Sequence, residues 1–286
     1  MNKVSAKLQF VISMLIFGTV GIFVREISAS SGVISMVRGL IGSAFLLVLI
    51  LRKSRMDMEA IKKNGIKLIL SGIFIGINWI LLFESYRYTT IAVSTLCYYM
   101  APMFVIIASP FLFGEKITLK KGICVLTAII GVILAFGIFD EEAGRDNKIF
   151  GALLALGSAV FYATVIIMNK KISGVTPYDK TFVQLASAAL VMLPYVFLTI
   201  NPDSISFEPK TIILLVIIGV VHTGFAYQMY FGTLERLKAQ TAALLSYIDP
   251  ITAIVISALI LREKISILTI IGAILILGSA VVSDRD

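Results

Sequence analysis

Ten long apolar runs, separated by short polar gaps, account for most of this 286-residue chain. A helix that crosses the hydrocarbon core of a bilayer needs about 20 mostly apolar residues, and each run is close to that length. The runs cover 8–25, 32–51, 66–85, 91–113, 118–138, 149–168, 180–200, 211–231, 239–261 and 266–283. The chain is 58% hydrophobic and 15% charged, whereas a soluble domain carries about 25% charged residues. The sequence therefore predicts an all-α integral membrane protein with ten transmembrane helices.

Lysine and arginine are concentrated in alternate gaps between the runs. If the N-terminus is cytoplasmic, most of them fall on the inner side, and the acidic gap at 139–148 falls outside. Cytoplasmic loops carry an excess of positive charge. This pattern predicts a multi-pass protein of the plasma membrane, in contact with lipid, with cytoplasmic N- and C-termini. It also explains the net charge of +8 without a nucleic-acid partner. The N-terminal run resembles a signal peptide, but more apolar runs follow, so we expect a retained first span.

A twenty-residue phrase occurs twice, as YMAPMFVIIASPFLFGEKIT from Tyr99 and as YIDPITAIVISALILREKIS from Tyr247. The copies lie in the fourth and ninth apolar runs, an offset of five spans, so equivalent helices cross the membrane in opposite directions. The chain is therefore predicted to contain two five-helix repeats of inverted topology, 1–140 and 149–286, that form one transport domain. Inverted repeats are a recurring design of secondary transporters, in which the two halves enclose a site near the bilayer midplane.

Each copy of the phrase holds a proline, Pro102 or Pro250, near the middle of its span. Proline inside a helix removes a backbone hydrogen bond and bends the helix. Such a kink is tolerated in lipid where a cavity or a neighbouring helix lies beside it. We interpret the two prolines either as hinges for gating or as ordinary bends.

Together, the ten spans, the two halves and the proline helices ending in GEKIT and REKIS resemble the EamA family of the drug/metabolite transporter superfamily. The resemblance covers nearly the whole chain. It implies ten helices, cytoplasmic termini and a central cavity between the halves. It also implies transport of small organic molecules such as amino acids, their derivatives or choline-like cations, by export in many members and import in some. Arg262 stands where the family more often has glycine before the glutamate.

Two titratable residues fall deep inside predicted spans. Asp249 directly precedes Pro250, and His222 is the only histidine in the chain. A buried carboxyl resists ionisation, so Asp249 can carry a proton, neutralise a cationic substrate, or hydrogen-bond the backbone at Pro250. Histidine titrates near neutral pH, so His222 can couple transport to protons or bridge two helices. The sequence does not show whether the two residues touch.

Further polar and aromatic residues are candidates for the lining of a cavity. Arg38 can bind a substrate carboxylate or extend to the outer headgroups. Asn78 is a second polar candidate, although it and Gln184 can equally join neighbouring helices, and Gln184 occupies roughly the place of Arg38 in the second half. Midplane aromatic side chains attract organic cations and stack on aromatic substrates. The aromatic candidates are Trp79, Tyr99, Tyr227 and Tyr247.

The glutamates at the ends of the repeated phrase, Glu115 and Glu263, can form a latch to the other half or a solvated turn with a local ion pair. We favour the solvated turn. Cys97 and Cys124 lie in apolar runs and form no metal pair, and no nucleotide-binding or catalytic motif is present. We therefore predict a non-enzymatic transporter without cofactor or metal, with a small-molecule substrate and with protons as a candidate coupling ion. A membrane-embedded enzyme and a passive channel are the remote alternatives.

Overall fold

The structure, a computed structural model, describes residues 3–53, 56–114, 116–135, 145–199, 208–234, 237, 245–263 and 265–283. These residues form helices and short connections, and none of them lies in a β-strand. The first half holds α1 (Lys3–Glu26), α2 (Ser31–Lys53), α3 (Met58–Lys63), α4 (Gly65–Tyr88), α5 (Ile91–Tyr98), α6 (Ala101–Phe113) and α7 (Leu119–Ala135). The second half holds α8 (Arg145–Lys170), α9 (Pro177–Thr199), α10 (Pro209–Ile217), η2 (Ile218–Phe225), α11 (Ala226–Leu234), α13 (Ile248–Leu259) and α14 (Ile267–Ser283).

Seven helical stretches in the described part are long and apolar enough to cross a membrane. They are Ala6–Glu26, Ser31–Arg52, Gly65–Tyr88, Ile91–Phe113, Asn147–Lys170, Pro177–Leu198 and Pro209–Thr233. The other three predicted spans overlap the shorter helices α7, α13 and α14, and α13 covers only 248–259 of the predicted 239–261. The protein is therefore an all-helical, multi-pass membrane protein, and a total of ten crossings stays a prediction. The linker at 139–148 lies largely outside the described residues.

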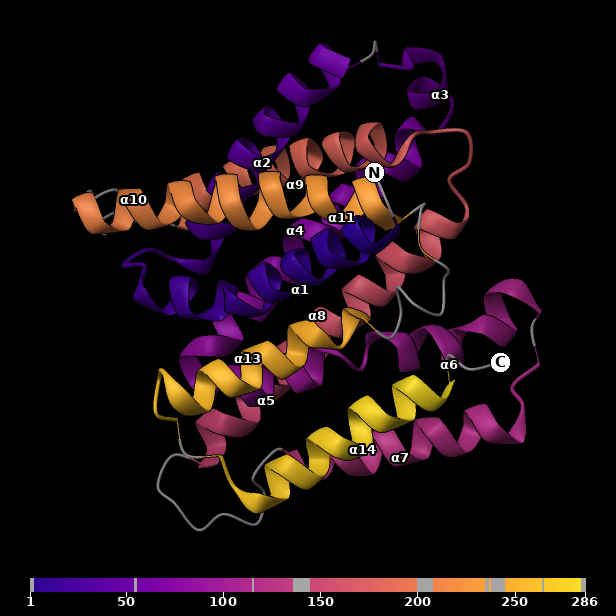
Figure 1. Cartoon of the computed structure of the whole chain (residues 1–286), viewed down its shortest axis with the longest axis vertical. Coiled ribbons are helices and arrows are strands. Elements are labelled where there is room, and N and C mark those ends of the chain that lie inside the picture. Colours follow the sequence, from indigo (N-terminus) through magenta and orange to yellow (C-terminus); the bar gives the residue numbers. More distant parts are fainter. Residues whose placement is uncertain are drawn as a thin grey trace.

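The helices lie side by side across the view in Figure 1, with the start of α1 and the end of α14 at the same side of the bundle. The most extensive packing joins α4 to α8, α7 to α14 and α2 to α9. Several contacts occur in related pairs, one from each half. The contact between α4 and α9 corresponds to the contact between η2 and α2. The contact between α1 and α13 corresponds to the contacts of α8 with α5 and α6. The predicted inverted relation of the halves stays a prediction.

Small residues allow the helices to approach closely. A Cβ atom added to Gly72 would lie 2.5 Å from the carbonyl oxygen of Gln184 on α9. Gly131 and Gly272 form a similar crossing between α7 and α14, where a Cβ on Gly272 would lie 2.5 Å from the Gly131 carbonyl oxygen.

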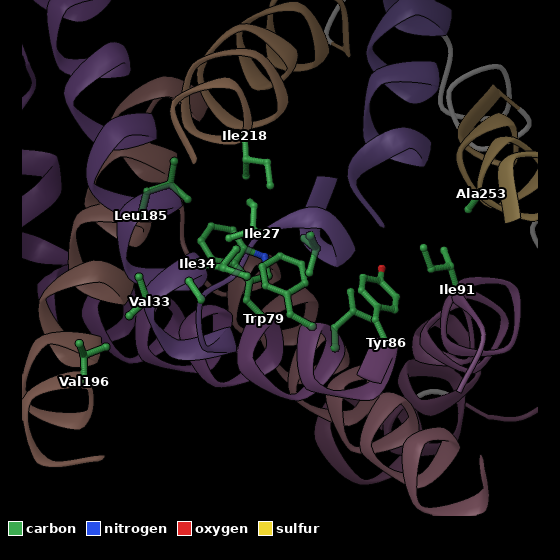
Figure 2. Packing of buried hydrophobic residues seen from close by; sticks show 14 of the residues in the cluster. Ile27, Val33, Ile34, Trp79, Tyr86, Ile91, Leu185, Val196, Ile218 and Ala253 are labelled. Atoms are coloured by element: carbon green, nitrogen blue, oxygen red, sulfur yellow. The ribbon is translucent and has the colours of Figure 1, made fainter. Parts of the chain in front are cut away.

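The largest apolar cluster contains residues from both halves. Figure 2 shows Ile34, Trp79 and Tyr86 of the first half beside Leu185 and Ile218 of the second. Burial of these side chains therefore holds the two halves together, and the candidate site forms at the same boundary.

Candidate functional site

The fourth predicted span is broken near its middle. α5 ends at Tyr98, Tyr99 occupies a turn, and α6 begins at Ala101. Tyr247, the equivalent residue of the second half, has nearly the same backbone angles directly before α13, with φ −71° and ψ −9° against φ −71° and ψ 3° for Tyr99. Helices broken at membrane depth form the substrate sites of many secondary transporters.

Pro102 lies at the middle of the fourth span, as predicted, and the helix is interrupted just before it. Pro102 and Pro250 lie in the first turns of α6 and α13. The first turn has N–H groups without intrahelical partners, so proline costs little there. The prolines therefore begin the second segment of each broken span, and their role as hinges stays a prediction.

The two copies of the repeated phrase meet at Asp249. The Tyr99 hydroxyl donates a hydrogen bond to the Asp249 carboxylate, with 2.8 Å between the oxygens. Asp249 lies in the first turn of α13, where the positive end of the helix dipole favours a negative charge. Both residues are half-buried. A carboxylate on the second half thus faces a phenol of the first half.

Tyrosine rings surround this pair. Tyr98 packs against Tyr99 and against Tyr162 of α8, with ring centroids 6.0 Å and 5.2 Å apart. Tyr227 of α11 packs on Phe17 of α1 at 5.2 Å. Asp249 interacts electrostatically with Tyr98, Tyr162 and Tyr227. Tyr247 is half-buried and packs against the apolar cluster that includes Cys97.

Arg38 on α2 is the most informative predicted residue because it is a cation that is only 6% exposed. Its Nε donates a hydrogen bond of 2.8 Å to the hydroxyl of Thr223. Its guanidinium carbon lies 4.4 Å from the ring centroid of Trp79, a favourable cation–π arrangement. Arg38 therefore lies in the interior of the bundle and does not extend to the headgroups.

The terminal nitrogens of Arg38 form no hydrogen bond with the described residues. The guanidinium interacts electrostatically with Asp249 and with the Tyr98 and Tyr227 hydroxyls. A buried charge is costly unless it is paired and hydrogen-bonded. The arrangement is thus suited to an anionic group of a ligand, which a planar guanidinium binds through two parallel hydrogen bonds.

His222 lies on η2, a π-helical segment in the middle of the eighth span. Its Nε2 lies 2.9 Å from the Thr19 hydroxyl of α1, and the ring packs edge-on against Phe23 at 4.6 Å. The other ring nitrogen, Nδ1, is buried without a hydrogen-bond partner among the described residues. His222 thus pairs with Thr19 while Asp249 pairs with Tyr99, and no hydrogen bond joins the two titratable groups in this structure.

Asn78 and Gln184 both join helices. Asn78 donates to the carbonyl oxygen and the hydroxyl of Ser158 on α8, each at 2.7 Å. Gln184 donates to Ser71 and Asn169 at the same distance. Since Asn78 is only 1% exposed, its amide is used for packing in this conformation. The Gln184–Ser71 contact between the seventh and third spans matches the Arg38–Thr223 contact between the second and eighth, as their predicted equivalence implies.

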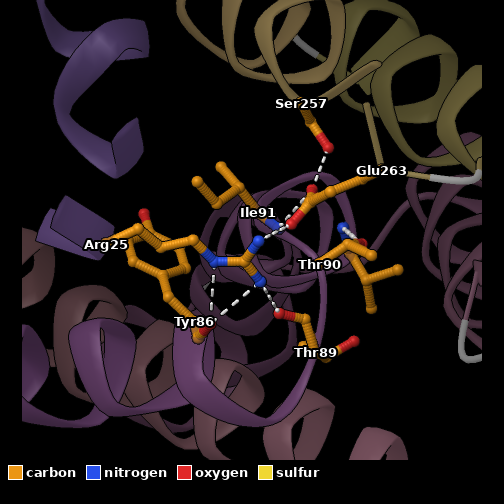
Figure 3. A network of polar contacts seen from close by, with 8 residues as sticks. Arg25, Tyr86, Thr89, Thr90, Ile91, Ser257 and Glu263 are labelled. Carbon is orange, nitrogen blue, oxygen red and sulfur yellow. Dashed lines mark hydrogen bonds and ion pairs between the residues drawn. The ribbon is translucent and has the colours of Figure 1, made fainter. Parts of the chain in front are cut away.

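A second polar network, shown in Figure 3, joins the ends of several helices. Glu263, which follows α13, forms an ion pair with Arg25 at the end of α1. The Glu263 side chain is only 8% exposed, so the expectation of a solvated turn is wrong for this glutamate. Glu115 lies outside the described residues.

Sequence reasoning did not single out Thr223 or Arg25. Arg25 looked like an ordinary charge at the end of a span. Thr223 is one of many hydroxyl residues in apolar runs, and only its place beside His222 distinguished it.

Comparison with known proteins gives the family. The sequence model of the EamA-like transporter family matches the chain twice, over residues 5–137 and 149–283. A relative from Bacillus subtilis (strain 168), named uncharacterized transporter YxxF, is 26% identical over 96% of this chain and 88% of its own length. A probable amino-acid metabolite efflux pump of Escherichia coli (strain K12) is 28% identical over 61% of this chain and 60% of its own length.

A solved crystal structure has the same fold, with a TM-score of 0.67 and 18% sequence identity over 99% of this chain and 97% of the other. The match of the family to both halves agrees with the repeated phrase, with the helical architecture and with the transporter names of the relatives. The chain belongs to the EamA-like transporter family.

Proposed function

We propose that this protein is a secondary transporter that exports amino acids or closely related metabolites across the cytoplasmic membrane by alternating access. The observation that carries the proposal is the placement of two opposite charges at the boundary between the halves. The terminal nitrogens of Arg38 in the first half form no hydrogen bond with the described residues, Asp249 of the second half is half-buried, and the two residues interact electrostatically.

An amino acid carries the complementary pair of charges. Its carboxylate can accept two hydrogen bonds from the Arg38 guanidinium. Its ammonium can pair with Asp249 and lie against the faces of Tyr98 and Tyr99, which attract cations. Binding would supply the terminal nitrogens of the buried guanidinium with the hydrogen-bond acceptors that the described residues do not provide. A ligand with only one of the two charges would leave the other group unpaired, which is costly in a buried site.

Alternating access is supported by the two-part architecture. The family match covers each half separately, the spans that hold Tyr99 and Tyr247 break at equivalent points, and related helix contacts occur in both halves. In our proposal, ten spans form two inverted repeats with both termini in the cytoplasm. Rocking of one half against the other would expose Arg38 and Asp249 first to one side and then to the other.

Proton coupling is assigned to Asp249, with His222 as a second titratable group. When protonated, Asp249 is neutral and has no counter-charge for a substrate ammonium. When ionised, it accepts the Tyr99 hydrogen bond and can bind the ammonium. Proton and substrate would therefore compete for one carboxylate, which is a simple way to exchange one for the other. Export is favoured by two relatives, from Escherichia coli and Salmonella typhimurium, named probable amino-acid metabolite efflux pumps.

The proposal is tested by thermal unfolding of the purified protein with three matched ligands, since a ligand of the native state raises its apparent stability. The ligands are an aromatic amino acid, its decarboxylated amine and its deaminated acid. The amino acid should stabilise the protein most. Arg38→Gln should remove the response to the acid and Asp249→Asn the response to the amine. The proposal is contradicted if none of the three ligands stabilises the protein. It is also contradicted if the amine and the amino acid stabilise the protein equally, both in wild type and in Arg38→Gln.

A second candidate is transport of a choline-like cation, favoured by Asp249 among Tyr98, Tyr99 and Tyr162. Arg38 discriminates between the two candidates. A buried guanidinium repels a cationic substrate, so Arg38→Gln would improve binding of a quaternary amine and weaken binding of an amino acid.

A further inference from the structure

The ion pair between Arg25 and Glu263 also binds the ends of two helices. Arg25 donates from Nε and Nη2 to the carbonyl oxygen of Tyr86, at 3.2 Å and 3.1 Å, and from Nη2 to that of Thr89 at 2.9 Å. These carbonyls belong to the C-terminal end of α4, where the helix dipole favours a cation. Arg25 is thus fixed by the first half independently of Glu263.

Glu263 binds the beginning of the next helix. Its carboxylate accepts a hydrogen bond of 3.1 Å from the backbone N–H of Ile91, the first residue of α5. The first N–H groups of a helix have no intrahelical partner, and the positive end of the dipole favours an anion there. Glu263 therefore supplies from the second half a cap for a helix of the first half, beside the cap that Thr90 gives to Val93.

The chain after α13 is shaped to hold Glu263 in this position. Arg262 has a φ of 52°, in the left-handed region that non-glycine residues seldom adopt. The backbone N–H of Glu263 then donates to the Ser257 carbonyl oxygen at 3.0 Å, and the Ser257 hydroxyl donates to the Glu263 carboxylate. Both hydrogen bonds tie the glutamate back to the last turns of α13, as Figure 3 shows for the side chain.

The pair joins the two halves at one end of the molecule. Arg25, the end of α4 and the start of α5 belong to the first half, and α13 with Glu263 belongs to the second. The same end holds a second ion pair, Glu26 with Lys210, 2.6 Å apart, but its side chains are 50% and 63% exposed. Exposed pairs contribute little to stability, whereas the nearly buried Glu263 carboxylate depends on its partners.

We propose that the Arg25–Glu263 pair is the latch that keeps this end of the transporter closed. The end opens only when α13 and Glu263 leave the junction of α4 and α5. The inference rests on the proposed alternating access. Under the predicted topology α1 ends on the outer face, so the latch closes the outward path to Arg38 and Asp249.

The test measures access to the interior and needs no substrate. The buried free cysteines Cys97 and Cys124 are replaced by alanine, and Ser246→Cys places a thiol beside the Tyr99–Asp249 pair. A membrane-impermeant maleimide is then applied to right-side-out and to inside-out vesicles. The variants are Glu263→Gln and Arg25→Gln, with Glu26→Gln as the matched control at the same end.

Glu263→Gln should raise the labelling rate from the outer face roughly ten-fold, the factor expected for loss of one charge-assisted hydrogen bond. Labelling from the inner face should fall. Arg25→Gln should act in the same direction, and Ser257→Ala should give a smaller one-sided increase even if the charge variants fail to fold. Glu26→Gln should label like the parent.

The latch is overturned if Glu263→Gln labels like the parent from the outer face, if labelling rises equally from both faces, or if Glu26→Gln gives the same increase. If the protein binds no amino acid but labelling changes on one side only, the latch holds and the proposed substrate is wrong.

Discussion

Replacement of Thr223 by valine tests whether substrate binding depends on how Arg38 is held. The variant keeps the arginine but removes the hydroxyl that accepts its hydrogen bond. Valine has nearly the shape of threonine but lacks the hydroxyl that accepts the Arg38 Nε–H at 2.8 Å and donates to the Ile218 carbonyl oxygen at 3.1 Å. Thr223 is fully buried, so water does not replace the lost acceptor. Arg38 would keep its charge and its contact with Trp79 but would no longer be fixed at Nε.

The expected loss follows from the hydrogen bond to a charged group, which contributes about 1.5–3 kcal/mol. Since 1.4 kcal/mol is a factor of ten in affinity, the apparent KM for an amino acid should rise about 10- to 100-fold in Thr223→Val. The maximal rate should change much less, because the halves and Asp249 are untouched. The measurement is the concentration dependence of amino-acid uptake into proteoliposomes.

Two controls make this prediction specific. Thr223→Ser restores the hydroxyl and should restore the KM. Thr233→Val removes an equally buried hydroxyl that bonds only to the Met229 and Tyr230 carbonyl oxygens of its own helix, so it should leave the KM unchanged. The reasoning is refuted if Thr223→Val has the parent KM, or if Thr223→Ser is as impaired as Thr223→Val.

The remaining predictions concern protons and packing. Asp249→Asn should fold normally but lose amino-acid transport at every pH; full activity with an unchanged pH profile removes this carboxyl from the mechanism. His222→Gln, which can keep a hydrogen bond to Thr19, should shift the pH dependence, and an identical curve leaves the histidine a packing role. Gly272→Ala should lower thermal stability by about 1–3 kcal/mol because its Cβ would meet the Gly131 carbonyl oxygen at 2.5 Å. A Cβ added to Gly278 on the same helix meets nothing within 4 Å, so Gly278→Ala should be neutral. Equal thermal stabilities of the two variants would show that α7 and α14 separate readily.

The helical architecture followed from the sequence because hydrophobic length alone selects membrane helices. The predicted runs 8–25 and 66–85 lie within α1 and α4, and the run 91–113 has the bounds of α5 and α6 taken together. The repeated phrase also indicated equivalent backbones, since Gly114 with φ 67° and Arg262 with φ 52° adopt the same left-handed turn. Glycine adopts it without strain, whereas arginine does so at a cost.

The site was predicted less completely, for two physical reasons. Proline predicts that a helix is disturbed, but it does not show that α5 ends at Tyr98 and that a new helix begins at Ala101. Side-chain pairing between distant spans depends on helix rotation, which hydrophobicity near the bilayer centre does not specify. Arg38 and Thr223 are 185 residues apart, and Thr223 lies on the π-helical segment η2, a local change that no simple sequence pattern indicates.

The most direct test of transport around Arg38 and Asp249 is substrate counterflow in proteoliposomes. Vesicles are loaded with unlabelled amino acid, and entry of the labelled compound is followed at low external concentration. The account predicts saturable entry that internal substrate accelerates, and loss of that acceleration in Arg38→Gln and Asp249→Asn. Entry that rises linearly with concentration and ignores the internal substrate would show a channel and contradict it.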